Sequence, residues 1–148
     1  IVNSVAGYEL FGGNLIIVDF GTATTFDVVD KDGAYVGGVI APGVNLSLQA
    51  LHQMAAALPH VDIARPKEVI GTNTVACMQS GVFWGYIGLV KEICRKIIEE
   101  KQEVIKIIAT GGLAPLLQSS DQLFEAVEDN LTMHGLRLIF DCNKSVDS

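Results

Sequence analysis

Residues 15–25, L-I-I-V-D-F-G-T-A-T-T, place an acid, a glycine and three threonines where phosphate chemistry could take place. Residues 15–18 are apolar and predict a buried strand, and Asp19 follows where a strand end would bring its carboxylate out of the core. Gly21 has no side chain, so a phosphate could approach the main-chain N–H groups of the turn. Three hydroxyl groups could bind phosphate oxygens or a hydrated cation: Thr22, Thr24 and Thr25. The pattern predicts a phosphate site, with an ordinary threonine-rich hairpin as the alternative.

Two further segments combine a glycine turn with the start of a helix. Residues 104–109 are predicted to form a buried strand that runs into Gly111 and Gly112, where a flat ligand such as adenine could lie against bare backbone. Residues 71–74, G-T-N-T, precede a long helix predicted over 75–100. Its first N–H groups lack partners within the helix and could receive a carboxylate or a phosphate. A plain helix cap is the alternative for this second segment.

Composition limits the classes of function open to this chain. Its 148 residues are 49% hydrophobic, which is enough for the core of one domain. The formal net charge of −7 disfavours non-specific nucleic-acid binding but not a nucleotide, whose phosphates respond to local dipoles and a bound cation. No apolar run approaches the roughly 20 residues of a membrane span, so we expect a cytoplasmic protein. The three cysteines and three histidines are scattered, which predicts neither a disulfide framework nor an all-protein metal site.

The elements that must position these residues can be predicted from periodicity and turn signals. Residues 1–10 indicate the end of a helix, and three strands follow at 15–18, 24–30 and 34–41, the last carrying Gly37 and Gly38 at a bulge or a close approach. Residues 44–58 predict a helix that covers one sheet face, and an irregular segment follows at 59–71. After the long helix and the strand at 104–109, a closing helix is predicted over 131–141. This order fits the ribonuclease-H-like domain of an actin-type ATPase, an α/β fold whose mixed sheet contains an antiparallel three-strand meander.

Six motifs in this order resemble type III pantothenate kinases along essentially the whole chain. They are D-F-G-T-A-T-T at 19–25, G-G-V-I-A-P-G at 37–43, V-I-G-T-N-T at 69–74, Q-S-G at 79–81, G-Y-I-G at 85–88 and T-G-G-L-A at 110–114. The protein-kinase meaning of D-F-G is rejected, because no H-R-D loop and no glycine-rich ATP loop accompany it.

The resemblance implies roles for six residues. Asp19 is similar to the family's ligand for a monovalent cation, potassium or ammonium, and Thr74 to a pantothenate contact. The ATP-binding residues that the resemblance implies are Gly21, Thr22, Gly111 and Gly112. No catalytic residue is assigned, because the family's acidic base belongs to a G-A-D-R motif that falls upstream of Ile1, as does its D-x-G-N-T phosphate motif. Residues 1–148 are therefore expected to be the C-terminal ATPase-like domain of a two-domain kinase and to be inactive alone.

The activity that the resemblance implies is ATP-dependent phosphorylation of pantothenate, the first step towards coenzyme A, with magnesium arriving with ATP. A homodimer is also implied, and three small residues on the long helix would permit such packing: Gly81, Gly85 and Gly88. Neither nucleic acid nor a membrane is expected as a partner. Two alternatives stay open: a non-catalytic transcriptional regulator of the Bvg accessory factor type, and another actin-type kinase of small molecules.

Overall fold

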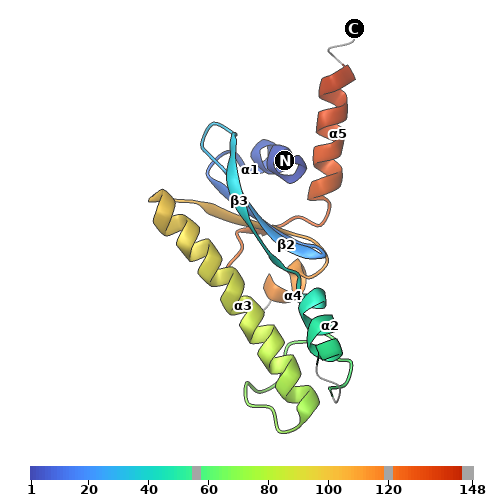
Figure 1. The fold of residues 1–148 in the computed structure, drawn as a ribbon. Coiled ribbons are helices and arrows are strands. Elements are labelled where there is room, and N and C mark those ends of the chain that lie inside the picture. The colour runs from blue at the N-terminus through green and yellow to red at the C-terminus, as the bar shows by residue number, and fades with distance from the viewer. Residues whose placement is uncertain (55–57, 119–121, 145–148) are drawn as a thin grey trace.

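The computed structural model of the protein describes residues 1–54, 58–118 and 122–144 (Figure 1). The helices are α1 (Val2–Phe11), α2 (Val44–Met54), α3 (Thr74–Lys101), α4 (Ala114–Gln118) and α5 (Leu131–Lys144). The strands are β1 (Leu15–Phe20), β2 (Ala23–Val29), β3 (Tyr35–Pro42), β4 (Lys106–Thr110) and β5 (Ala126–Val127). They form one mixed sheet in the order β3-β2-β1-β4-β5.

The first three strands form the antiparallel meander that the sequence predicts. β2 pairs with β1 and with β3 in antiparallel register, whereas β4 runs parallel to β1 and β5 runs parallel to β4. The turn between β2 and β3 is closed by the Asp30 side chain, whose Oδ1 accepts hydrogen bonds from the N–H groups of Asp32 and Ala34, each at 2.9 Å. Gly33 adopts φ 86° in this turn, a conformation that suits glycine. The mixed sheet with its meander confirms the predicted fold class.

Gly37 and Gly38 in β3 were predicted to mark either a bulge or a close approach of another segment, and the structure shows both. The pairing of β2 with β3 shifts between Val28 and Val29, opposite Gly37, whose φ is 133°. A Cβ on Gly38 would lie 2.3 Å from the Phe26 carbonyl oxygen, so the two backbones approach closely there. The bulge and the close approach therefore occur side by side.

Helices cover both faces of the sheet (Figure 1). α1 and α5 pack on the face that carries Leu15, Ile17 and Ile108, and their own contact is tight because a Cβ on Gly135 would lie 2.2 Å from the Val2 carbonyl oxygen. α3 and α4 cover the opposite face, where Phe26 is fully buried. Alternating apolar side chains on β1 and β2 thus feed two separate clusters, as expected for a sheet buried on both sides.

The helix predicted from the G-T-N-T segment is confirmed as α3, which runs for 28 residues. Asn73 is its N-cap, and the Asn73 side chain accepts a hydrogen bond of 2.9 Å from the Ala76 N–H. No helix among the described residues is both long enough and apolar enough to cross a bilayer.

Three expectations about the elements need correction. The strand predicted over 104–109 begins only at Lys106, and Val104 is 91% exposed, because residues 102–105 are used to turn the chain from α3 into the sheet. β5 was not predicted, because a strand of two residues is too short to show a periodic pattern.

The helix predicted over 44–58 ends at Met54 among the described residues. Residues 55–57 lie outside the described residues, and Leu58 is not helical. α2 also lies beside α3 at the end of the meander instead of covering a sheet face, which leaves Leu51 39% exposed (Figure 1).

Candidate functional site

The two glycine turns of the sequence leave the same edge of the sheet. β1 and β4 are adjacent parallel strands, and Asp19 stands opposite Thr110 in their register. The turn at Gly21 and the turn at Gly111 therefore begin side by side at the carboxyl ends of neighbouring strands. In open α/β sheets, ligands bind in the crevice at this end of the strands.

An open cleft of about 480 Å³ lies between these turns. The residues that line it are Phe20, Gly21, Thr22, Asn45, Leu46, Gln49, Gly112 and Leu113. Three of the four predicted ATP-binding residues thus meet in one hollow, and the fourth, Gly111, is the neighbour of a lining residue. Asn45, Leu46 and Gln49 come from α2 and were not predicted from the sequence.

α2 reaches the cleft because Gly43 packs directly on the Thr22 turn. A Cβ on Gly43 would lie 2.0 Å from the Thr22 carbonyl oxygen, so no side chain fits there. Pro42 ends β3 opposite Ala23, and α2 begins two residues later. The Pro42-Gly43 pair therefore turns the exposed side chains of the first turns of α2 towards the cleft. This pair is the sequence signal from which the position of those side chains could have been inferred.

Gly111 fixes the other wall of the cleft. Its φ is 94°, and a Cβ there would lie 2.6 Å from the Phe20 carbonyl oxygen, which belongs to backbone. Gly112 differs, because no atom lies within 4 Å of a Cβ added to it. Gly111 is thus required for packing against β1, whereas Gly112 presents open backbone to the cleft.

The prediction that Thr24 offers its hydroxyl to a phosphate is wrong. Thr24 is 1% exposed, and its hydroxyl is hydrogen-bonded to the hydroxyl of Tyr86 on α3. Burial raises the pKa of Tyr86 to about 12. Successive side chains of a strand point to opposite faces, so Thr24 faces α3 while Thr25 shares the other face with Asp19, its partner in the register. Thr22 stays exposed at the cleft.

Asp19 lies beside the Gly21 turn, although it is not among the residues that line the cleft. Its Oδ1 is 4.0 Å from the position that a Cβ on Gly21 would occupy. Its Oδ2 accepts a hydrogen bond of 2.8 Å from Nδ2 of Asn3, which is 8% exposed on α1. The two carboxylate oxygens thus have different surroundings, one held by the protein and one directed at the turn.

A second carboxylate, Asp27, shares this sheet face on the neighbouring strand. Burial raises the pKa of Asp27 above its usual 3.8, and the negative charge of Asp19 adds to the rise, while the amino group of Ile1, 3.9 Å away, opposes it. A raised pKa means that the ionised form of Asp27 is less favourable in the folded protein than in the unfolded chain.

We expect Asp27→Asn to stabilise the protein at pH 7. The folded protein holds the Asp27 proton to a higher pH than the unfolded chain does, so this residue costs stability as the pH rises above 3.8. The gain in the free energy of unfolding should increase as the pH rises above 3.8. It should vanish near pH 3, where Asp27 is protonated in both the folded and the unfolded state. Urea denaturation at several pH values measures it, with the exposed Asp32→Asn as control. A pH-independent difference between Asp27→Asn and the unaltered protein would contradict the assignment.

Thr74 is the first residue of α3 and is exposed. It lies outside the cleft lining, but its neighbours Thr72 and Ala76 line a second hollow, of about 420 Å³, under the loop that precedes α3. Arg65 and Lys67 also line this hollow. The structure thus gives Thr74 an accessible position at a helix N-terminus but does not bring it together with Asp19 or Thr22.

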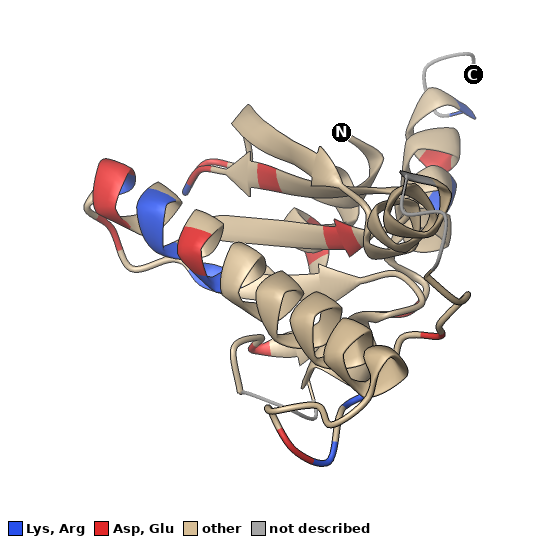
Figure 2. Ribbon diagram, turned by 60° about the horizontal axis from the view of Figure 1, so that its bottom comes forward, with Lys and Arg blue, Asp and Glu red and all other residues tan. Residues whose placement is uncertain are grey.

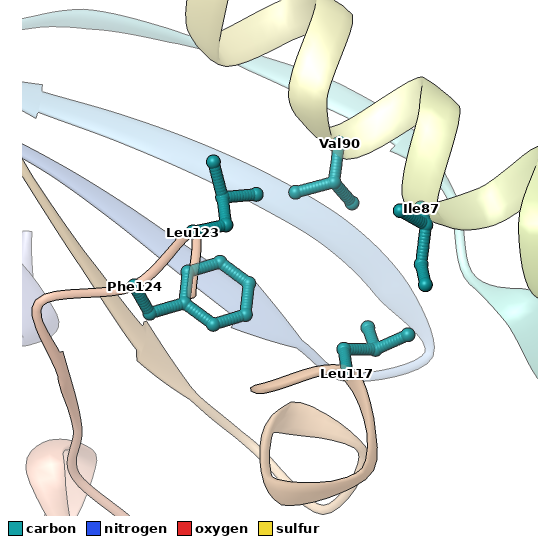
Figure 3. Close-up of a pocket in the computed structure, with 5 residues that line it drawn as sticks. All are labelled: Ile87, Val90, Leu117, Leu123 and Phe124. Carbon is teal, nitrogen blue, oxygen red and sulfur yellow. The ribbon is translucent and has the colours of Figure 1, made fainter. Parts of the chain in front are cut away.

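A third pocket, shown in Figure 3, is a gap in the core. Five apolar side chains line it: Ile87, Val90, Leu117, Leu123 and Phe124. It offers no polar group, so we assign it to packing between α3 and the segment around α4. Within the described ranges, no group of three or more His, Cys, Asp or Glu side chains is placed to hold a metal ion.

In a comparison with known protein families, residues 1–96 match the family model of type III pantothenate kinase. The type III pantothenate kinase of Roseobacter denitrificans is 69% identical over 147 residues, which are 99% of this chain and 57% of that protein. The chain thus spans just over half the length of the curated relatives that it matches.

Solved structures share its fold at low sequence identity. A Campylobacter jejuni protein described as a Baf family transcriptional activator superposes with a TM-score of 0.65 at 22% identity, over 95% of this chain and 63% of that chain. The activator of 2-hydroxyisocaproyl-CoA dehydratase from Clostridium difficile, with bound ADPNP, gives a TM-score of 0.56 at 12% identity, over 99% of this chain and 67% of that chain. These identities show a shared fold alone.

Proposed function

Because this chain belongs to the type III pantothenate kinase family, we propose that it forms the ATP-binding wall of an enzyme that phosphorylates pantothenate. The reaction is transfer of the γ-phosphoryl group of ATP to the hydroxyl of pantothenate, the first step towards coenzyme A. One observation supports this function most: Gly21, Thr22 and Gly112, from turns about 90 residues apart, line one cleft at the carboxyl ends of two parallel strands.

Each residue has a role that its surroundings can support. The exposed hydroxyl of Thr22 and the backbone N–H groups of its turn would bind phosphate oxygens, and the bare backbone of Gly111 and Gly112 would lie against the adenosine. Oδ1 of Asp19 is an anionic oxygen beside the turn, which suits a potassium or ammonium ion. Such a cation would offset phosphate charge, and magnesium would arrive with ATP. Positioning and charge neutralisation are what phosphoryl transfer requires of the protein.

The function is tested by assaying ADP and phosphopantothenate formation with ATP, magnesium and potassium. Two proteins should be compared: the purified chain, and a chimera in which residues 1–148 replace the matching segment of the Roseobacter denitrificans kinase. Pantothenate-dependent turnover by the chimera, close to that of the parent kinase, is the expected result. A chimera that folds and binds ATP but releases no phosphopantothenate would reject the function. Other hydroxyl compounds as acceptors test whether the enzyme is a different small-molecule kinase.

Thr74→Ala is expected to raise the KM for pantothenate about tenfold or more while changing the KM for ATP less than about twofold. Loss of one hydrogen bond to a partner left unsatisfied costs about 1–3 kcal/mol. The exposed Thr74 side chain takes no part in the cap of α3, which Asn73 provides, so its loss should leave the helix intact. Steady-state kinetics of the chimera measure both constants, with Thr72→Ala as the neighbouring control. Equal changes for the two substrates would count against a substrate role for Thr74.

We also propose that two copies of the chain pack along the first half of α3. No Lys, Arg, Asp or Glu occurs between Thr74 and Val90, as the uncoloured half of this helix shows in Figure 2. Gly81, Gly85 and Gly88 are exposed there, and no atom lies within 4 Å of a Cβ added to any of them. Light scattering should give the mass of a dimer, and Gly85→Arg should give a monomer. Gln53→Arg, on the exposed side of α2, is the control and should stay dimeric.

The regulatory alternative is less well supported. The likeness to the Campylobacter jejuni protein shows a shared fold only, and the net charge of −7 disfavours direct contact with DNA. Pantothenate-dependent ADP formation separates the two functions, since a regulator without catalysis would release none.

A further inference from the structure

Asn3 is a buried amide whose two polar ends are both engaged. Its Nδ2 donates to Oδ2 of Asp19 at 2.8 Å, and its Oδ1 accepts from Oγ1 of Thr132 at 2.7 Å. An ionised carboxylate only accepts hydrogen bonds, so the NH₂ end of Asn3 must face Asp19. Thr132 then has to donate its hydroxyl proton to the remaining carbonyl end. The chain Thr132–Asn3–Asp19 therefore has one direction and joins α5, α1 and β1.

The hydrogen bond from Asn3 constrains how Asp19 presents its charge. One oxygen, Oδ2, is turned towards α1 and satisfied there, which leaves Oδ1 directed at the Gly21 turn, 4.0 Å from the Cβ position of Gly21. Without the amide, rotation of the carboxylate about its Cβ–Cγ bond would be opposed only by packing. The group that fixes the rotation is itself 8% exposed and thus shielded from competing water.

We propose that Asn3 is a positioning residue that holds the Asp19 carboxylate in the rotation needed to bind a monovalent cation at the Gly21 turn, and that Thr132 orients the Asn3 amide. This inference rests on the proposed function, in which Asp19 holds that cation. Removing a residue that hydrogen-bonds to a metal ligand and orients it typically lowers metal affinity by 10- to 100-fold.

The chain offers a matched control one residue away. Ser4 is also on α1 and 3% exposed, and its Oγ is buried without a hydrogen-bond partner. Ser4→Ala therefore removes a buried polar group of the same helix that contacts neither Asp19 nor Thr132 through a hydrogen bond. Thr132→Val keeps the shape of an exposed side chain and removes only its hydroxyl, so it should fold even if Asn3→Ala is unstable.

The test is calorimetric binding of the ATP analogue ADPNP to the purified protein as KCl is varied, with ionic strength held constant by choline chloride. We expect Asn3→Ala to raise the half-saturating KCl concentration about tenfold and Thr132→Val about threefold, with ADPNP affinity at saturating KCl unchanged within about twofold. Ser4→Ala should match the unaltered protein. Thermal unfolding of the same samples shows whether each variant is folded.

The outcomes separate this inference from the proposed function. If the unaltered protein responds to KCl and folded Asn3→Ala and Thr132→Val respond at the same concentration, Asn3 has only a structural role and the inference is wrong. If the unaltered protein binds ADPNP without any response to KCl, the cation role of Asp19 is wrong and the inference fails with it. A loss of melting temperature alone, with no shift in the KCl response, also overturns it.

Discussion

Gly111→Ala is expected to lower the free energy of unfolding by about 3 kcal/mol and to abolish tight nucleotide binding. The substituted residue would have to keep φ at 94°, which L side chains rarely adopt, with its Cβ 2.6 Å from the Phe20 carbonyl oxygen. The neighbouring atom is backbone in a buried strand and has little freedom to move. Relief of the clash must separate the ends of β1 and β4, and those strand ends carry both walls of the cleft.

Gly112→Ala is the matched control, because Gly112 has neither the positive φ nor the close backbone contact of Gly111. No atom lies within 4 Å of its added Cβ, so unfolding should change by less than about 1 kcal/mol. If adenosine lies on this backbone, the new methyl group should still weaken nucleotide binding. Urea denaturation and calorimetry on both variants give the two quantities. Equal losses of stability in the two variants would contradict the division of roles between Gly111 and Gly112.

Most of the sheet could be predicted because its determinants are local. A D-K-D-G turn joins two strands, and the Asp30 side chain and Gly33 close it in the way such turns require. Asn73 precedes a long run without proline and caps α3 as expected. The parallel contact of β1 with β4 joins residues 91 positions apart and was not predicted, since no pattern within either strand specifies a distant partner.

The cleft was only half predictable, for reasons of register and packing. Thr24 and Thr25 are alike in the sequence, and only the pairing of Thr25 with Asp19 determines which of them faces α3. The side chains that α2 contributes to the cleft, Asn45 among them, depend on how closely Gly43 approaches the Thr22 turn. Neither the register of the two strands nor the approach of Gly43 to the Thr22 turn can be inferred from one segment of the sequence alone. Glycine turns therefore predicted where a ligand could approach, but not which hydroxyls would meet it.

The second large effect is expected for Asp19, whose carboxylate has one satisfied oxygen and one directed at the Gly21 turn. Asp19→Asn keeps the size of the side chain, and its amide oxygen can still accept the hydrogen bond from Asn3. The negative charge is lost, and the end of the side chain beside the Gly21 turn becomes an NH₂ group, which cannot bind a cation. A neutral amide holds a cation less well than a carboxylate does, and charge neutralisation at the phosphates is a large part of phosphoryl transfer.

We therefore expect Asp19→Asn to lower turnover of the chimeric kinase about 100-fold and to remove its dependence on potassium. Asp27→Asn is the control, because it removes the same charge from the same sheet face without a place beside the Gly21 turn. Turnover should be measured across a KCl series for both variants, with unfolding curves to show that each is folded. Potassium activation that survives in Asp19→Asn, or is lost equally in Asp27→Asn, would mean that net charge on this face matters and that Asp19 is not the cation ligand. Loss in Asp19→Asn alone would place the cation at the Asp19 carboxylate, whose Oδ1 lies next to the Gly21 turn.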